Sequence, residues 1–221
     1  MSSVPASIPP DLYSRFEQAL RAGEADSAES LARQMLDIGI DPNTLVQGAL
    51  VPILTEVGQQ FQDFHIYLPE LMMAGDAASR VTALLEQLTL QAGQAPLARG
   101  TVVIGQVEGD IHDIGRSIVR TLLASHAFRV VDLGHDVPAS AFLEAAQKER
   151  ADIVGLSALM TTTLPAQRRT LRLFEEVGQR QRYKIIIGGG AASQSWADEI
   201  HADGYAADAA AAVELCKQLI A

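Results

Sequence analysis

The chain has 221 residues, of which 48% are hydrophobic and 20% are charged, and this composition excludes a disordered chain. No apolar run approaches the roughly 20 residues that span a bilayer, and the N-terminus lacks the basic flank and apolar core of a signal peptide, so we expect a cytoplasmic protein without a membrane partner. The single cysteine, Cys216, excludes an internal disulfide and a self-contained iron–sulfur cluster. A net charge of −10 argues against a nucleic-acid partner, because Lys and Arg must neutralise phosphates there.

The first half of the chain is predicted to be a four-helix bundle, because its apolar residues recur at helical spacing. The expected helices cover residues 11–22, 25–38, 42–63 and 68–90. Asp11 and Asp41 are predicted as N-caps, and Gly23 and Gly39 as helix stops. Residues 91–100 have the small, Gly- and Pro-containing composition of a linker, so we place one domain at 1–92 and a second at 93–221.

The second half alternates short β-branched runs with amphipathic stretches. Alternating strands and helices predict a doubly wound, flavodoxin-like sheet of five parallel strands. Ligands of such sheets bind beyond the carboxyl ends of the strands. The expected strands are 101–107, 129–133, 152–156, 184–187 and 204–206.

The loop from Gly109 to Gly115 follows the first expected strand and contains Asp110 and His112. In an extended stretch these two side chains lie on the same side, where a carboxylate can accept a proton-bearing imidazole nitrogen. Such a partner fixes the tautomer and raises the basicity of the other nitrogen, as a metal-bound histidine requires. The alternative is a solvated histidine with Asp113 capping the next helix.

Two further loops are expected at the same edge of the sheet. After the third strand, the hydroxyls of Ser157, Thr161 and Thr163 could bind a polar ligand edge or cap a helix. After the fourth strand, the run Gly188–Gly190 leaves room for something wide, and it lacks the Lys-Ser/Thr of a P-loop.

Together these three loops resemble the cobalamin-binding domain of methionine synthase and of the small corrinoid proteins of methylamine, methanol and methoxy-aromatic systems. The motifs are Asp-x-His-x-x-Gly at Asp110–Gly115, Ser-x-Leu at Ser157–Leu159, and Gly-Gly at Gly188 and Gly189. The resemblance implies that His112 is the lower axial ligand of cobalt, that Asp110 is its hydrogen-bond partner, and that Thr163 continues the relay.

The resemblance also implies which residues contact the cofactor. Ser157, Leu159 and Thr161 would line a deep pocket for the displaced nucleotide tail, opposite the two glycines. The full expected set is Gly109, Asp110, Ile111, His112, Asp113, Ile114, Gly115, Ser157, Leu159, Thr161, Gly188, Gly189 and Ala207. Of the other histidines, His135 is the one expected near this face.

The first half resembles the helical cap that precedes this domain in the same family. There the cap covers the upper face of the corrin, and Phe61, Tyr67, Leu68 and Met72 are the candidates for that contact. The alternative for each of the four is ordinary bundle core.

The resemblance implies a methyl-carrier subunit rather than a complete enzyme. Its expected partners are a donor-specific methyltransferase, an acceptor methyltransferase and a reductive activation protein, with the 91–100 linker as hinge; a homodimer is left open. One alternative is a cobalamin-dependent regulator or sensor, although the chain shows no DNA-binding domain and no tryptophan in its first half. A detached mutase subunit and a cobalamin storage or chaperone protein are the other two.

Overall fold

The computed structural model describes residues 8–91 and 98–220, and contacts between residues divide the chain into two compact units. The helical unit comprises residues 1–99 with Ala124–Ala127, and the sheet unit comprises Gly100–Leu123 with Phe128–Ala221. Residues 92–97 of the expected linker lie outside the described residues. Within the described ranges, no helix combines the length and the apolar composition that a membrane span requires.

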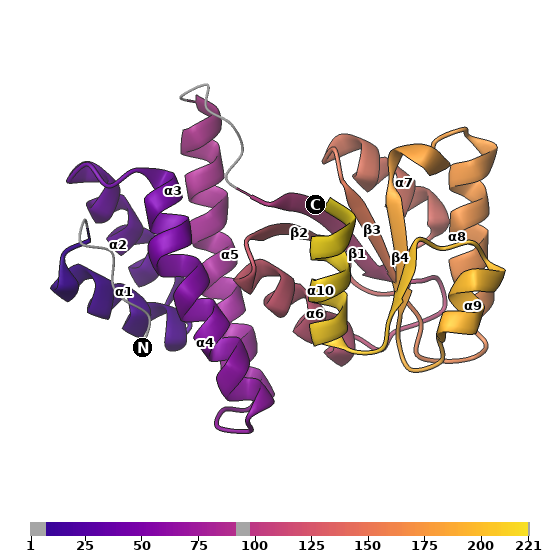
Figure 1. Ribbon diagram of the computed structural model, residues 1–221, viewed down its shortest axis with the longest axis horizontal. Helices are drawn as coiled ribbons and strands as arrows, with labels where there is room; N and C mark the ends of the chain where they lie inside the picture. The colour runs from indigo at the N-terminus through magenta and orange to yellow at the C-terminus, as the bar shows by residue number, and fades with distance from the viewer. Residues whose placement is uncertain (1–7, 92–97, 221) are drawn as a thin grey trace. The chain divides into compact units, whose positions relative to one another are not determined.

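The first half of the chain forms a unit of helices (Figure 1), and each long helix buries apolar residues. Helices α1, α2 and α4 all pack against α5, and α1 also packs against α2. The predicted four-helix organisation is confirmed, with one interruption in the third helix. The elements are α1 (Pro10–Arg21), α2 (Ala25–Asp37), α3 (Pro42–Leu45), η1 (Val46–Leu50), α4 (Val51–Gln62) and α5 (Leu68–Gln91).

The helix ends follow the sequence signals with one exception. Asp41 caps α3 by accepting the Thr44 N–H at 3.0 Å, and Gly23 and Gly39 adopt the positive φ of residues that end helices. The prediction for Asp11 was wrong: Pro9 is the N-cap and Asp11 lies inside the first turn. The reason is Pro10, whose fixed φ already suits the first helical position and starts the helix one residue earlier.

The interruption in the third helix is a π-helical turn over Val46–Leu50. At this turn the Val51 N–H donates to the Val46 carbonyl five residues earlier. Pro52 follows at the start of α4, and a proline has no N–H with which to continue the ordinary ladder. The wider turn is therefore the local answer to a proline inside a helical pattern.

The sheet unit contains five strands that pair in parallel in the order β2-β1-β3-β4-β5. This order is that of the flavodoxin-like sheet, so the predicted fold is confirmed. The strand bounds differ from the prediction by about one residue. The strands are β1 (Gly100–Gln106), β2 (Phe128–Asp132), β3 (Ile153–Ser157), β4 (Lys184–Gly188) and β5 (Gly204–Ala206).

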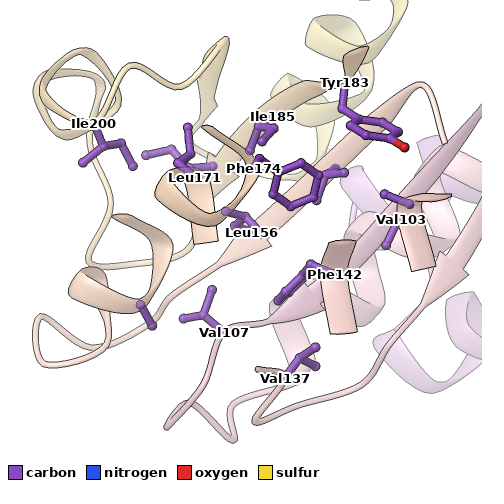
Figure 2. Close-up of a cluster of buried hydrophobic side chains, with 14 of the residues drawn as sticks. Val103, Val107, Val137, Phe142, Leu156, Leu171, Phe174, Tyr183, Ile185 and Ile200 are labelled. Carbon is purple, nitrogen blue, oxygen red and sulfur yellow. The ribbon is translucent and has the colours of Figure 1, made fainter. Parts of the chain in front are cut away.

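Each face of the sheet carries its own apolar cluster, because alternate residues of a strand point to opposite faces. Val103 of β1 packs with α7 (Ala139–Lys148), α8 (Leu164–Glu176) and α9 (Gln194–Glu199) in the cluster that Figure 2 shows. Val102 and Ile104 belong to the cluster on the other face, with α6 (Ile114–Ser125) and α10 (Ala209–Ile220).

The common direction of the strands decides where the connecting loops lie. Since all five strands run in the same direction, the loops that follow them meet at one edge of the sheet. A short 3₁₀ turn, η2 (Arg180–Arg182), lies at the opposite edge, before β4.

Candidate functional site

The loop after β1 turns tightly just beyond the sheet. The Val107 N–H donates to the Ser157 carbonyl at 3.0 Å, and the Asp110 N–H donates back to the Val107 carbonyl at 3.0 Å. Gly109 has a φ of 84°, a left-handed conformation that glycine adopts at little cost, and this permits the tight turn. Gly115 lies within α6, and a Cβ there would meet nothing within 4 Å. Neither a tight turn nor a close contact therefore requires glycine at this position.

Asp110 is fully buried at the centre of this loop. Its Oδ1 accepts the His112 side-chain Nδ1–H at 2.8 Å, the His112 backbone N–H at 3.1 Å and the Gln106 amide at 3.3 Å. Its Oδ2 accepts the Leu159 N–H at 2.6 Å and lies 2.9 Å from the Thr163 hydroxyl, which donates to it. The carboxylate thus ties the loop after β1 to the loop after β3.

These bonds decide the charge of Asp110. Burial alone would raise the pKa of this carboxyl. The hydrogen bonds from the His112 ring, from the backbone N–H groups of Leu159 and His112, and from Thr163 outweigh burial and hold the pKa well below its usual range. Asp110 is therefore an ionised acceptor at neutral pH.

His112 is held by this carboxylate at one ring nitrogen. Because Nδ1 donates to Asp110, Nε2 is the nitrogen with a lone pair for a metal, and the side chain is 45% exposed. The ring is therefore tied to a buried anion although it is exposed to solvent, and helix capping by Asp113 stays an alternative. The arrangement matches the carboxylate–histidine pairing that supports metal-bound imidazoles.

Thr163 precedes α8, where a threonine commonly caps the helix. Its side chain makes no cap hydrogen bond; instead the buried hydroxyl lies 2.9 Å from Asp110 Oδ2 and 2.8 Å from the Met160 carbonyl. The capping alternative is wrong for this residue. The fold thus brings Thr163, which is distant in the sequence, to the same carboxylate that holds His112.

The other predicted contact residues lie at the same edge, on the loops after the strands, at the ends of β3 and β4, and at the start of α6. Ile111, Ile114 and Leu159 are large apolar side chains with exposed fractions of 67%, 64% and 46%. Three large apolar side chains exposed on adjacent segments are uncommon on a protein surface. They suit a face that binds an apolar ligand. Asp113, Thr161 and Ala207 are exposed, whereas Ser157 and Gly188 are half-buried at the ends of β3 and β4.

Gly189 has a structural reason to be glycine. Its φ is 98°, and a Cβ there would stand 2.2 Å from the Ala158 carbonyl oxygen. The loops after β3 and β4 therefore approach each other backbone to backbone, which any side chain at this position would prevent. The glycine run was predicted to leave room for a wide ligand, and both that role and the lining of a tail pocket stay predictions.

Two glutamines of the site were missed by sequence reasoning. Gln106 reaches Asp110, and the fully buried Gln167 of α8 donates to the carbonyls of Leu156 at 2.9 Å and Gly188 at 3.1 Å. Gln167 also accepts the Trp196 indole N–H at 2.9 Å. Gln167 lies on the apolar face of α8, and a polar residue on a buried face is the signal that could have identified it.

The four helical-unit candidates can be placed within their own unit. Tyr67 is 73% exposed, so the bundle-core alternative is wrong for this residue. Phe61, Leu68 and Met72 are half-buried and lie outside the fully buried core. The contact of these side chains with a corrin stays a prediction.

The grouping of metal-binding side chains limits how a metal could be held. In the described part of the chain, no group of three or more His, Cys, Asp or Glu side chains is placed to hold a metal ion. His112 can therefore supply one ligand, and a metal bound there must bring its remaining ligands with it.

Comparison with known proteins gives the family. A model described as a B12 binding domain matches residues 100–214, and a second B12 binding domain model matches residues 12–86. The dimethylamine corrinoid protein 1 of Methanosarcina acetivorans is 46% identical over 182 residues, covering 82% of this chain and 85% of that protein. The chain belongs to the B12-binding corrinoid protein family.

Two solved structures share the fold of this corrinoid protein. The methanol:cobalamin methyltransferase complex MtaBC from Methanosarcina barkeri contains a chain that matches with a TM-score of 0.80 at 32% identity, covering all of this chain and 86% of that one. The monomethylamine corrinoid protein of the same organism matches with a TM-score of 0.54 at 29% identity, covering 95% and 98%.

The cofactor of this family is a cobalamin-type corrinoid, and the residues present fit it. A corrinoid would bring most of the ligands of its cobalt with it, so a single oriented imidazole would suffice as the protein ligand. His112 offers one such nitrogen, and exposed apolar side chains on the same edge suit the ring.

Proposed function

We propose that this corrinoid protein carries a methyl group on the cobalt of its cofactor between a donor methyltransferase and an acceptor methyltransferase. The observation that carries the proposal is the Asp110–His112 pair, which leaves one imidazole nitrogen oriented beyond the carboxyl end of β1. Support comes from relatives named for dimethylamine and from a solved relative in complex with a methyltransferase. A reductive activation protein would be a third partner.

His112 would hold the corrinoid by binding its cobalt through Nε2. Ionised Asp110 would keep the Nδ1 proton in place and increase the electron density at Nε2, and Thr163 would hold the second carboxylate oxygen. When bound, the corrinoid supplies a cobalt centre that can accept a methyl group and release it. The protein supplies binding, orientation and electrostatics.

The remaining predicted residues would shape the seat of the cofactor. Ser157, Leu159 and Thr161 would line a pocket for the displaced nucleotide tail, with Gly188 and Gly189 on its other wall. The close backbone approach of Gly189 to Ala158 supports this assignment, because it keeps side chains out of that wall. Gly109, Ile111, Asp113, Ile114, Gly115 and Ala207 would contact the corrinoid from the loops around it.

The test is reconstitution of the full chain with hydroxocobalamin, read by visible absorption. We expect a spectrum of histidine coordination that His112→Ala abolishes. His135→Ala is the matched control, because His135 is also exposed on a loop at this edge and should leave the spectrum unchanged. Coordination that survives His112→Ala would overturn the ligand assignment.

The carrier role needs its own assay. The loaded protein is incubated with methyltransferases encoded beside its gene and with methylamines or methanol, and methyl uptake is followed by absorption. We expect uptake with at least one pair and none with His112→Ala or without the methyltransferase. Binding of cobalamin without uptake from any such pair would favour the regulator or storage alternatives.

A further inference from the structure

The connection between β2 and α7 runs beside the end of β1. The Gln106 N–H donates to the Gly134 carbonyl at 2.9 Å, and the Val137 N–H donates to the Gln106 carbonyl at 3.0 Å. A parallel bridge pairs Val107 with Val137. The two segments are therefore held backbone to backbone up to the start of the loop that contains His112 (Gly109–Gly115, the histidine loop).

Asp136 continues this connection past Val107. The Gly109 N–H donates to Asp136 Oδ1 at 2.7 Å, and the Asp136 N–H donates to the Asp110 carbonyl at 2.9 Å. Asp136 thus holds two successive residues, Gly109 through its N–H and Asp110 through its carbonyl. These bonds fix the backbone from which the Asp110 carboxylate projects.

The residue type at position 136 suits this double contact. Asp136 has a φ of 55°, a left-handed conformation that aspartate and asparagine tolerate better than most residues. In this conformation its N–H and its carboxylate both reach the histidine loop. Most other side chains would lose the acceptor, strain the backbone, or do both.

We propose that Asp136 is a positioning residue that sets the direction of the His112 imidazole toward the corrinoid cobalt. The proposal rests on the proposed function, because it assumes that His112 ligates cobalt. Asp136 fixes the backbone of Asp110, and the Asp110 carboxylate fixes the His112 ring at 2.8 Å. A shift of the Asp110 backbone is therefore passed on to Nε2.

A merely structural role would give a different result. Asp136 is exposed, so loss of its carboxylate should affect folding little. Loss of a group that orients a metal ligand typically weakens metal binding about 10-fold or more. The proposal therefore predicts that cofactor coordination and folding respond differently to the same substitution.

Three variants of the full chain separate these roles. Asp136→Gly removes the carboxylate and keeps the left-handed backbone accessible, whereas Asp136→Asn keeps an oxygen acceptor and removes the charge. Arg150→Gly is the matched control, because Arg150 is also an exposed left-handed residue, with a φ of 52°. It lies between α7 and β3, at the other edge of the sheet.

The measurements are the dissociation constant for hydroxocobalamin and the nitrogen hyperfine pattern of the reduced, paramagnetic cofactor. Labelling the protein with [15N]histidine changes that pattern only where histidine is the ligand. We expect Asp136→Gly to weaken binding about 10-fold and to reduce the histidine-ligated fraction. Asp136→Asn should restore both, and Arg150→Gly should match the unmodified chain. Melting temperatures of the two glycine variants should be similar.

The outcomes separate the two proposals. If the unmodified chain shows no histidine-dependent pattern, the assignment of His112 fails, whatever Asp136 does. If the unmodified chain shows the pattern and Asp136→Gly keeps it at full affinity, the assignment of His112 stands and the role of Asp136 is overturned. A loss with Asp136→Gly that Asp136→Asn does not restore also overturns positioning by the hydrogen-bond acceptor.

Discussion

The two ends of the sheet use the same residue types for different purposes. At the carboxyl end, buried Asp110 accepts from backbone and side-chain donors of three elements, and Gly189 permits contact between two loop backbones. At the amino end, exposed Asp152 accepts the Thr101 N–H at 2.8 Å, and Gly178 faces open space. Polar groups at one end assemble a site, whereas those at the other end finish a turn.

The largest expected difference between the ends is the effect of removing each aspartate. Asp110→Ala leaves buried donors without an acceptor, so it should lower the free energy of unfolding of the apoprotein by about 3 kcal/mol. Asp152→Ala, which removes one exposed bond, should cost under about 1 kcal/mol. Urea titration followed by the fluorescence of Trp196, the single tryptophan, measures both. Equal costs would refute the contrast.

The glycines give a second and smaller difference. Gly189→Ala places a Cβ against the Ala158 carbonyl at a φ of 98°, and we expect a loss of about 2–3 kcal/mol. Gly178→Ala meets the backbone cost alone, at a φ of 68° with nothing within 4 Å, so about 1 kcal/mol is expected. The same urea titration applies. A cost for Gly189→Ala no greater than that for Gly178→Ala would mean that the loops after β3 and β4 separate easily.

The smallest expected effect concerns whether the two ends open together. Cys216 of α10 is buried, and burial raises the pKa of its thiol to about 12, so a thiol reagent should react only after the unit opens. If both ends open as one unit, saturating hydroxocobalamin at the carboxyl end should slow labelling at least about 10-fold. Labelling at an unchanged rate would instead show local opening around α10.

Much of this organisation could be predicted because it depends on local pattern. Hydrophobic periodicity gave the helices and strands, and alternation of the two gave the parallel sheet. Asp110 and His112 are two positions apart, so their side chains lie on the same side of an extended segment. Their pairing could therefore be predicted from this spacing. Residues whose role depends on one short segment were therefore within reach.

Contacts between distant segments could not be predicted in the same way. Asp136 meets the loop after β1, and Gln167 of α8 meets the ends of β3 and β4, only once the sheet has formed, so their partners could not be predicted from adjacent residues. The N-cap prediction for Asp11 was wrong for a local reason, because Pro10 takes the first helical position and starts the helix before Asp11. Thr163 had two plausible roles, and the position of Asp110 in space decided between them.

The bond between Trp196 and Gln167 gives the protein an optical reporter of its own. The indole is hydrogen-bonded to an amide that also holds the carbonyls of Leu156 and Gly188, at the ends of two central strands. Because no other tryptophan is present, emission comes from this one position. A corrinoid is a strong visible chromophore, so filling the edge of the sheet should dim that emission, and occupancy could be followed without labelling the chain.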